Sequence, residues 1–124
     1  MAMTPGQRAE FSYRVTAADT AAQLGSGDVA VLGPRVLALM ERATVQAVAR
    51  SLEPGETTVG VSAHLEHLAA SPVGATVDVE AVVQERTGRR ITCTARMSAG
   101  ERTLATANIV RVVVNRATFE AGTG

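Results

Sequence analysis

The stretch PRVLALMERATVQAVARSL, residues 34–52, carries the periodicity of one long amphipathic helix. Pro34 suits the first position of a helix, where its missing N–H costs no hydrogen bond. Apolar or small residues then recur at steps of three and four and form one stripe: Leu37, Met40, Thr44, Ala47 and Val48. Residues 53–56, EPGE, end the helix. Because the stripe must be buried against another element, the rest of the chain has to supply a second layer.

Four segments after this helix alternate apolar and polar residues, which is the period of β-strands. They cover residues 57–69, 75–86, 89–99 and 101–116. The second segment carries on one face Val77, Val79, Ala81 and Val83. The third carries on one face Ile91, Cys93, Ala95 and Met97. Short turns at residues 87–88 and at Gly100 favour antiparallel pairing of the last strands.

Two further segments precede the helix. Residues 10–16, EFSYRVT, alternate apolar and polar side chains and are expected to form a first strand. Residues 17–33 are rich in alanine and glycine without a steady period, so we expect a long loop, or a short helix followed by a loop. A connection of this length is more often a lid or a binding loop than an idle link.

The predicted architecture is α+β, with one long helix wrapped by a curved antiparallel β-sheet of about five strands. The 124 residues fit a single domain, 1–124, with a flexible tail at about residues 120–124. The free edges of such a sheet need cover, which a homodimer commonly provides.

The composition of the chain narrows its partners. Twelve basic and twelve acidic residues give zero formal net charge, which argues against nucleic acid as the main partner. The start, MAMTPGQRAE, lacks the pattern of a secretory signal, and no apolar run approaches the roughly 18–20 residues that cross a bilayer. We therefore expect a soluble cytoplasmic protein without a membrane partner. Cys93 cannot form an internal disulfide, and its alternating context indicates a small buried residue.

An imidazole ends the apolar face of segment 57–69. That face consists of Val59, Val61, Ala63 and Leu65. His67 takes the next position on it, where a strand enters a loop and functional groups are often presented. A lone histidine at such a position is still more often a hydrogen-bonded structural residue. His64 is expected on the opposite, more polar face, so the two histidines do not predict a metal site.

A carboxylate, Glu41, lies on or at the edge of the helix stripe. It is either an edge group that reaches water, paired with Arg42 or Arg50, or a functional group that faces the core. Gly60, within a β-rich run, marks either a bulge or a close approach of backbone or ligand. Glu41, His67 and an exposed amide of Gly60 would together make an acid–base site in which carboxylate and imidazole share a proton near neutral pH.

Several motifs in this order resemble a known family. They are LALMERA (residues 37–43), LEPGETTVG (52–60), HLAASPVG (67–74) and VRVVVNRATF (110–119). The chain resembles, from about residue 9 to 119, the hotdog-fold acyl-CoA thioesterases of the fluoroacetyl-CoA thioesterase-like family.

The resemblance implies a homodimer with acyl-CoA sites at the subunit interface, with dimer or tetramer left open, and no cofactor besides the CoA of the substrate. By position in these motifs, Glu41 and His67 correspond to catalytic residues of the family. Gly60 corresponds to a glycine whose amide polarises the thioester carbonyl, and Arg111 to an arginine that recurs in the last strand.

Two positions depart from the family pattern. Gly33-Pro34 stands where the family usually has Thr-Pro, so this substrate-binding position lacks its hydroxyl. Asn108-Ile109 stands where the family usually has Thr-His. The hydroxyls of Ser26 and Thr44 are not aligned to replace the missing one.

These departures leave two functions to compare. The first is an acyl-CoA thioesterase that hydrolyses a small or medium acyl-CoA to free acid and CoA, with water activated at Glu41 and with reduced activity, because losing a positioned group costs on the order of 10²–10⁴ in rate. The alternative is a non-catalytic or very slow acyl-CoA or small-metabolite binding protein. A purely structural dimer ranks below both. A preference for fluoroacetyl groups is not expected, since the loop before Gly33 lacks aromatic residues for a tight lid.

Overall fold

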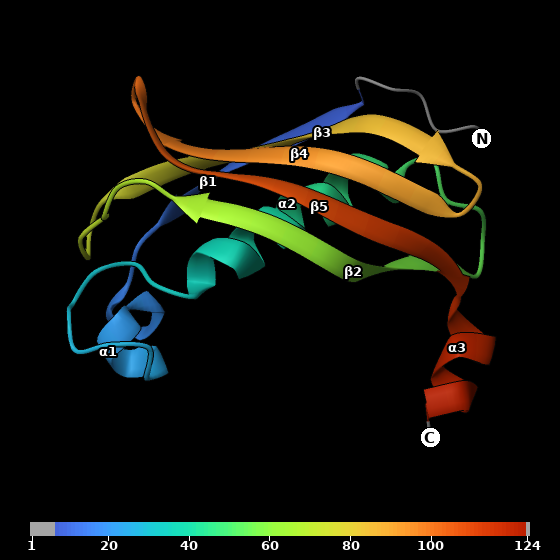
Figure 1. Cartoon of the computed structure of the whole chain (residues 1–124), viewed down its shortest axis with the longest axis horizontal. Coiled ribbons are helices and arrows are strands. Elements are labelled where there is room, and N and C mark those ends of the chain that lie inside the picture. Colours follow the sequence, from blue (N-terminus) through green and yellow to red (C-terminus); the bar gives the residue numbers. More distant parts are fainter. Residues whose placement is uncertain (1–6, 124) are drawn as a thin grey trace.

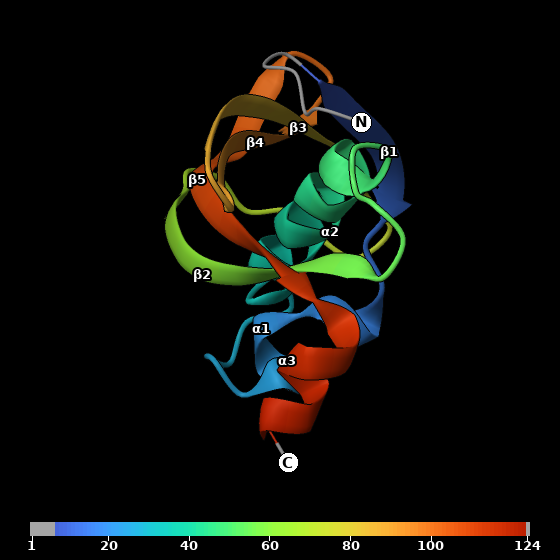
Figure 2. The ribbon, with the colours of Figure 1, turned by 90° about the vertical axis from the view of Figure 1, so that its right-hand side faces the viewer.

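The computed structural model describes residues 7–123, which form one curved five-stranded sheet around a long helix (Figure 1). The sheet order is β1-β3-β4-β5-β2, and every neighbouring pair is antiparallel. The strands are β1 (Arg8–Arg14), β2 (Glu56–His67), β3 (Thr76–Thr87), β4 (Arg90–Ala99) and β5 (Arg102–Asn115). The helix α2 (Arg35–Ala49) lies in the concave face of the sheet (Figure 2). The predicted α+β arrangement is confirmed.

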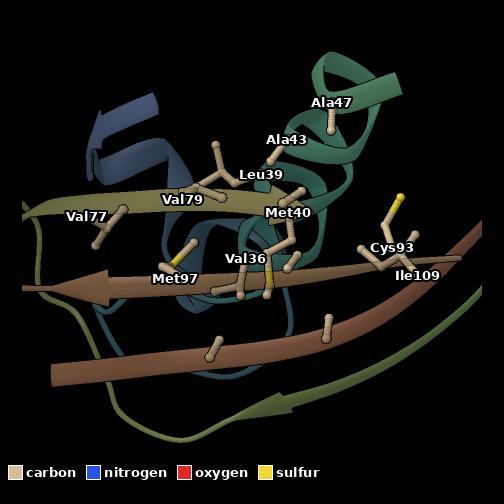
Figure 3. Packing of buried hydrophobic residues seen from close by; sticks show 14 of the residues in the cluster. Val36, Leu39, Met40, Ala43, Ala47, Val77, Val79, Cys93, Met97 and Ile109 are labelled. Atoms are coloured by element: carbon tan, nitrogen blue, oxygen red, sulfur yellow. The ribbon is translucent and has the colours of Figure 1, made fainter. Parts of the chain in front are cut away.

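The core fills the space between α2 and the sheet (Figure 3). The predicted inner faces of β3 and β4 are buried throughout. On the helix the buried side chains are Val36, Leu39, Met40, Ala43, Thr44, Ala47 and Val48. The predicted stripe was wrong at Leu37, which is 36% exposed. A sheet that curls around a helix covers a wider arc than a flat one, so the buried stripe includes Val36 and Leu39 and leaves Leu37 at its rim.

A β-bulge interrupts the edge strand β2 between Gly60 and Ser62. Residues opposite each other on antiparallel strands share a face, so Gly60 lies on the concave face with its buried partner Arg111. After the extra residue, Val61, the concave positions are those of odd number and include His67. The predicted inner face of β2 is therefore correct for the residues that follow the bulge. It was wrong for those that precede the bulge, because Val59 pairs with Val112 on the convex face.

The connection before α2 contains a 3₁₀ turn, η1 (Ala17–Asp19), and a short helix, α1 (Ala21–Leu24). The expectation of a short helix and a loop is confirmed. Isolated bridges join Thr20 to Leu32 and Val31 to Pro72, so the connection is tied at several points. The first strand begins and ends two residues earlier than predicted.

A helix, α3 (Arg116–Thr123), occupies most of the segment expected to be a flexible tail. The Asn115 side chain accepts a hydrogen bond from the Thr118 N–H at 3.1 Å, and Arg116 pairs with Glu120 one turn on at 3.5 Å. These local contacts explain why a helix forms where the composition alone indicated disorder. Among residues 7–123, no helix is long and apolar enough to cross a membrane.

Candidate active site

Glu41, Gly60 and Arg111 meet where α2 crosses strands β2 and β5. A Cβ atom added to Gly60 would lie 2.7 Å from Oε2 of Glu41 and 3.4 Å from Nη1 of Arg111. The carboxylate of Glu41 lies 3.7 Å from the guanidinium of Arg111, and the Glu41 side chain is 40% exposed. A side chain at position 60 would displace this carboxylate from its observed position, so the close approach favours glycine there. The predicted edge position of Glu41 is confirmed, although its partner is neither Arg42 nor Arg50.

The guanidinium of Arg111 is almost fully buried and has its donors directed at fixed acceptors. Its Nε donates to Oγ1 of Thr58 at 2.8 Å, and its Nη2 donates to the Thr58 carbonyl at 3.1 Å. Burial lowers the pKa of Arg111, and the charge of Glu41 opposes that shift. These contacts fix the Arg111 guanidinium beside the Glu41 carboxylate.

His67 borders a different hollow, about 410 Å³ in volume, at the start of α2. Gly33 also borders it, and most of the remaining lining is apolar: Ala21, Val31, Leu32, Val36, Leu37 and Leu65. Within one chain, Glu41 is not part of this lining. Gly60, which contacts Glu41, lies seven positions from His67 on β2. Roughly 20 Å along the strand therefore separates His67 from the place where Glu41 lies. A single chain therefore presents the two predicted catalytic residues at separate places.

Gly33 packs directly against the backbone of α1. A Cβ atom at position 33 would lie 2.8 Å from Cα and 2.9 Å from N of Ala21, which is closer than packed atoms approach. The hydroxyl of Thr44 does not compensate for the missing one, because it is buried and donates to the Glu41 carbonyl at 2.6 Å. Ser26 borders the hollow.

The sequence reading missed two residues that shape this region. Thr58 was not identified because its inward position depends on the bulge, which Gly60 indicated only as one of two alternatives. Asp19 was also missed, although the spacing Thr16-x-x-Asp19 is that of a capping box, and this motif is present at the start of η1.

Comparison with known proteins places this chain in a family. The family model described as fluoroacetyl-CoA-specific thioesterase matches residues 15–117. The chain belongs to the fluoroacetyl-CoA-specific thioesterase family. The predicted hotdog fold and the predicted class of acyl-CoA thioesterase are thereby confirmed for the family of this chain.

Individual members and structural neighbours of the family agree with this result. The fluoroacetyl-CoA thioesterase of Streptantibioticus cattleyicolor is 35% identical over 86 residues, which are 69% of this chain and 62% of that protein. A solved structure of a fluoroacetyl-CoA thioesterase superposes with a TM-score of 0.90 at 30% identity, over 99% of this chain and 96% of the other. A hot-dog-like protein from Thermanaerovibrio acidaminovorans has a TM-score of 0.87 at 22% identity, over 96% and 89% of the two chains, and shows the fold alone.

Proposed function

We propose that this member of the thioesterase family hydrolyses a small or medium acyl-CoA to free acid and CoA, with Glu41 and His67 as its catalytic residues. The observation that supports this most directly is the carboxylate of Glu41, held by Arg111 against the backbone of Gly60. A carboxylate that stays partly exposed can orient and deprotonate a water, and a neighbouring backbone N–H can stabilise the oxyanion that forms. A relative at 29% identity was solved in complex with acetyl-CoA.

The apolar hollow beside His67 is the proposed site for the acyl group. Its volume of about 410 Å³ exceeds the roughly 150 Å³ cavity that holds a benzene ring. Its lining offers surface for an apolar chain longer than two carbons and contains no phenylalanine, tyrosine or tryptophan among the described positions. The acyl group that fits best is accordingly of medium length.

The complete site is proposed to form in a homodimer through the edge strand β2. Within residues 7–123, no strand pairs with the outer edge of β2, and the bulge residue Val61 is 49% exposed. An exposed edge of this length is a ready surface for pairing with another chain. Two copies of β2 that pair antiparallel would extend the sheet across a two-fold axis.

The bulge supports a particular register for this pairing. Gly60 and His67 are seven positions apart and would lie on opposite faces of a regular strand. The extra residue Val61 places both on the concave face. An antiparallel dimer with its two-fold axis at His64 then sets Gly60 opposite His67 of the partner subunit. In that register, Glu41 of one subunit and His67 of the partner subunit flank the same cleft.

Hydrolysis is tested with a panel of acyl-CoAs from two to twelve carbons, by following thiol release. The variant Glu41→Gln is expected to lose about 10²–10⁴-fold in kcat, because it removes the proton acceptor and keeps the shape. Glu85→Gln, an exposed glutamate on β3, is the matched control. Equal rates for wild type and Glu41→Gln across the panel would refute the catalytic role, and tight binding without turnover would support the alternative of a binding protein.

Sharing of the site between subunits is tested by mixing two inactive variants. A dimer of one Glu41→Gln chain and one His67→Ala chain contains one site in which both groups are intact. After unfolding and refolding together, half of the dimers are mixed, so up to about a quarter of the wild-type activity should return. A site formed within one chain would give no recovery, and that result would exclude the proposed register.

A further inference from the structure

A roof segment, defined as residues 20–33, pairs with itself and lines one side of the hollow beside His67. The N–H of Ala21 donates to the Val31 carbonyl at 2.9 Å, and the N–H of Ala22 donates to the Val29 carbonyl at 3.1 Å. Farther along, the Leu32 N–H donates to the Ser71 carbonyl at 2.8 Å. The roof segment is therefore a small hairpin that is attached to the loop after β2 through Val31 and Leu32, and its inner residues line the hollow.

Asp19 lies at the base of this hairpin, in a buried position that is only 2% exposed. Its carboxylate accepts hydrogen bonds from the Tyr13 hydroxyl at 2.8 and 2.9 Å and from the Thr16 N–H and hydroxyl at 2.7 and 2.9 Å. The fourth donor is Nε of Arg35 at 3.1 Å, which also forms an ion pair with the carboxylate. One carboxylate thus joins β1, η1 and the first residue of α2.

The main chain of Asp19 connects the same point to the other end of the roof segment. Its carbonyl accepts a hydrogen bond from the Gly33 N–H at 3.2 Å. Both ends of the hairpin, Thr20 and Gly33, are therefore held at Asp19, close to the start of α2. Since Gly33 is packed against Ala21 without room for a Cβ atom, a shift at this base would move the whole cover of the hollow.

The ionisation of Asp19 agrees with this tight hold. Burial by itself would raise the pKa of Asp19, but hydrogen bonds from Thr16, Tyr13 and Arg35 together keep it below the usual aspartate value. The side chain is therefore charged at neutral pH and depends on its donors. An amide in its place would keep the shape, lose the charge, and have to point its NH₂ group at one of these donors.

We propose that Asp19 is a positioning residue that holds the roof segment against the acyl hollow and thereby sets which acyl groups the site accepts. The inference rests on the proposed thioesterase function for its effect on selectivity. Its effect on the roof segment itself does not depend on activity. The two consequences can be measured separately.

The first experiment compares Asp19→Asn with wild type in amide hydrogen exchange without substrate. Faster exchange is expected in the hairpin amides, those of Ala21, Ala22, Leu32 and Gly33, by about tenfold or more, with amides of β3 and β4 unchanged. Asp28→Asn is the control, because it makes the same substitution in an exposed part of the same segment. If the hairpin amides of Asp19→Asn exchange as in wild type, the proposal is wrong.

The second experiment measures kcat/KM for acetyl-CoA and octanoyl-CoA. Asp19→Asn should lower kcat/KM for octanoyl-CoA by about 10–100-fold, since small displacements of a binding surface have effects of this size. The loss for acetyl-CoA should be at least about fivefold smaller, because a two-carbon group contacts little of the roof. A merely structural residue would lower the melting temperature and both rates together with an unchanged ratio, and that outcome overturns the role in selectivity.

Two further outcomes are distinguishable. If wild type hydrolyses no acyl-CoA, the proposed function fails, and the exchange measurement still decides whether Asp19 holds the roof segment. If Asp19→Asn does not fold, Tyr13→Phe replaces it, since this change removes one donor and keeps the ring. Tyr13→Phe should shift hairpin exchange and the substrate ratio in the same directions, and unchanged values would reject the proposal.

Discussion

The main chain of Ala21 lies so close to Gly33 that a Cβ atom added at position 33 would lie 2.8 Å from the Cα of Ala21. Restoring the threonine that the family usually has at this position would therefore displace backbone. We expect Gly33→Thr to lower the free energy of unfolding by about 1–3 kcal/mol, as overpacking does, and not to increase kcat. Gly122→Thr, at a position with open space around it, is the control. Urea denaturation and the thioesterase assay check both points; a stable and faster Gly33→Thr would contradict them.

A second glycine should respond differently to the same kind of change. A Cβ atom at Gly60 would meet the end of the Glu41 side chain, which can rotate away at little cost. Gly60→Ala should thus change the free energy of unfolding by less than about 1 kcal/mol and reduce kcat by about 10–100-fold, because the carboxylate moves. Ser62→Ala, on the same strand, should leave kcat unchanged. Full activity of Gly60→Ala would show that the carboxylate position is not critical.

Arg111 is expected to act through Glu41. Arg111→Met fills most of the space but leaves the Thr58 hydroxyl and carbonyl without their donor, at a cost of about 1–3 kcal/mol. We expect kcat to fall with little change in KM, and the loss to be absent when Glu41→Gln is already present. A double-mutant cycle with both substitutions measures this coupling. Additive losses, or a rise in KM alone, would assign Arg111 to substrate binding. Arg96→Met, an exposed arginine on β4, is the control.

The lowered pKa of Asp19 predicts a specific dependence of stability on pH. When the pKa of a carboxylate is lower in the folded chain than in the unfolded chain, the carboxylate stabilises the fold at pH values above its unfolded pKa of 3.8. This stabilisation is lost as the pH falls through the pKa of the folded chain. The difference in unfolding free energy between wild type and Asp19→Asn should be constant from pH 5 to 7 and shrink below pH 4. Urea denaturation at each pH measures it, with Asp78→Asn as an exposed control. A difference that grows on acidification would contradict the assignment.

The single cysteine should be unreactive in the folded protein. Burial raises the pKa of the Cys93 thiol to about 11, against an opposing influence of Arg111. The thiolate that reacts with iodoacetamide is then about 100-fold scarcer than at the ordinary value of 9.0, and access is blocked as well. Labelling at pH 8 should be slow in buffer and complete in urea. Rapid labelling of the native protein, followed by mass spectrometry, would show that β4 opens readily.

Local sequence pattern predicted most of the layers of this protein. The helix periodicity around Met40 and the alternation in β3 and β4 depend on residues a few positions apart, and a regular backbone repeats them faithfully. The motif order also identified the family and pointed to Glu41, Gly60 and His67. The burial of Val36 was not predicted, since it depends on how the sheet curls around α2. The helix α3 was not predicted either, although the contacts that stabilise it are local.

The tertiary structure alone placed the groups of the site. The bulge at Val61 puts Gly60 and His67 on one face. Glycine at position 60 left a bulge open as one alternative, and only the pairing with β5 decides it. Glu41 meets Arg111, and Gly33 meets the backbone of Ala21, because the sheet closes around α2 and brings distant segments into contact. Periodicity records which face a residue takes within its own element. It carries no information on which atom of another element will lie opposite, and packing determines that.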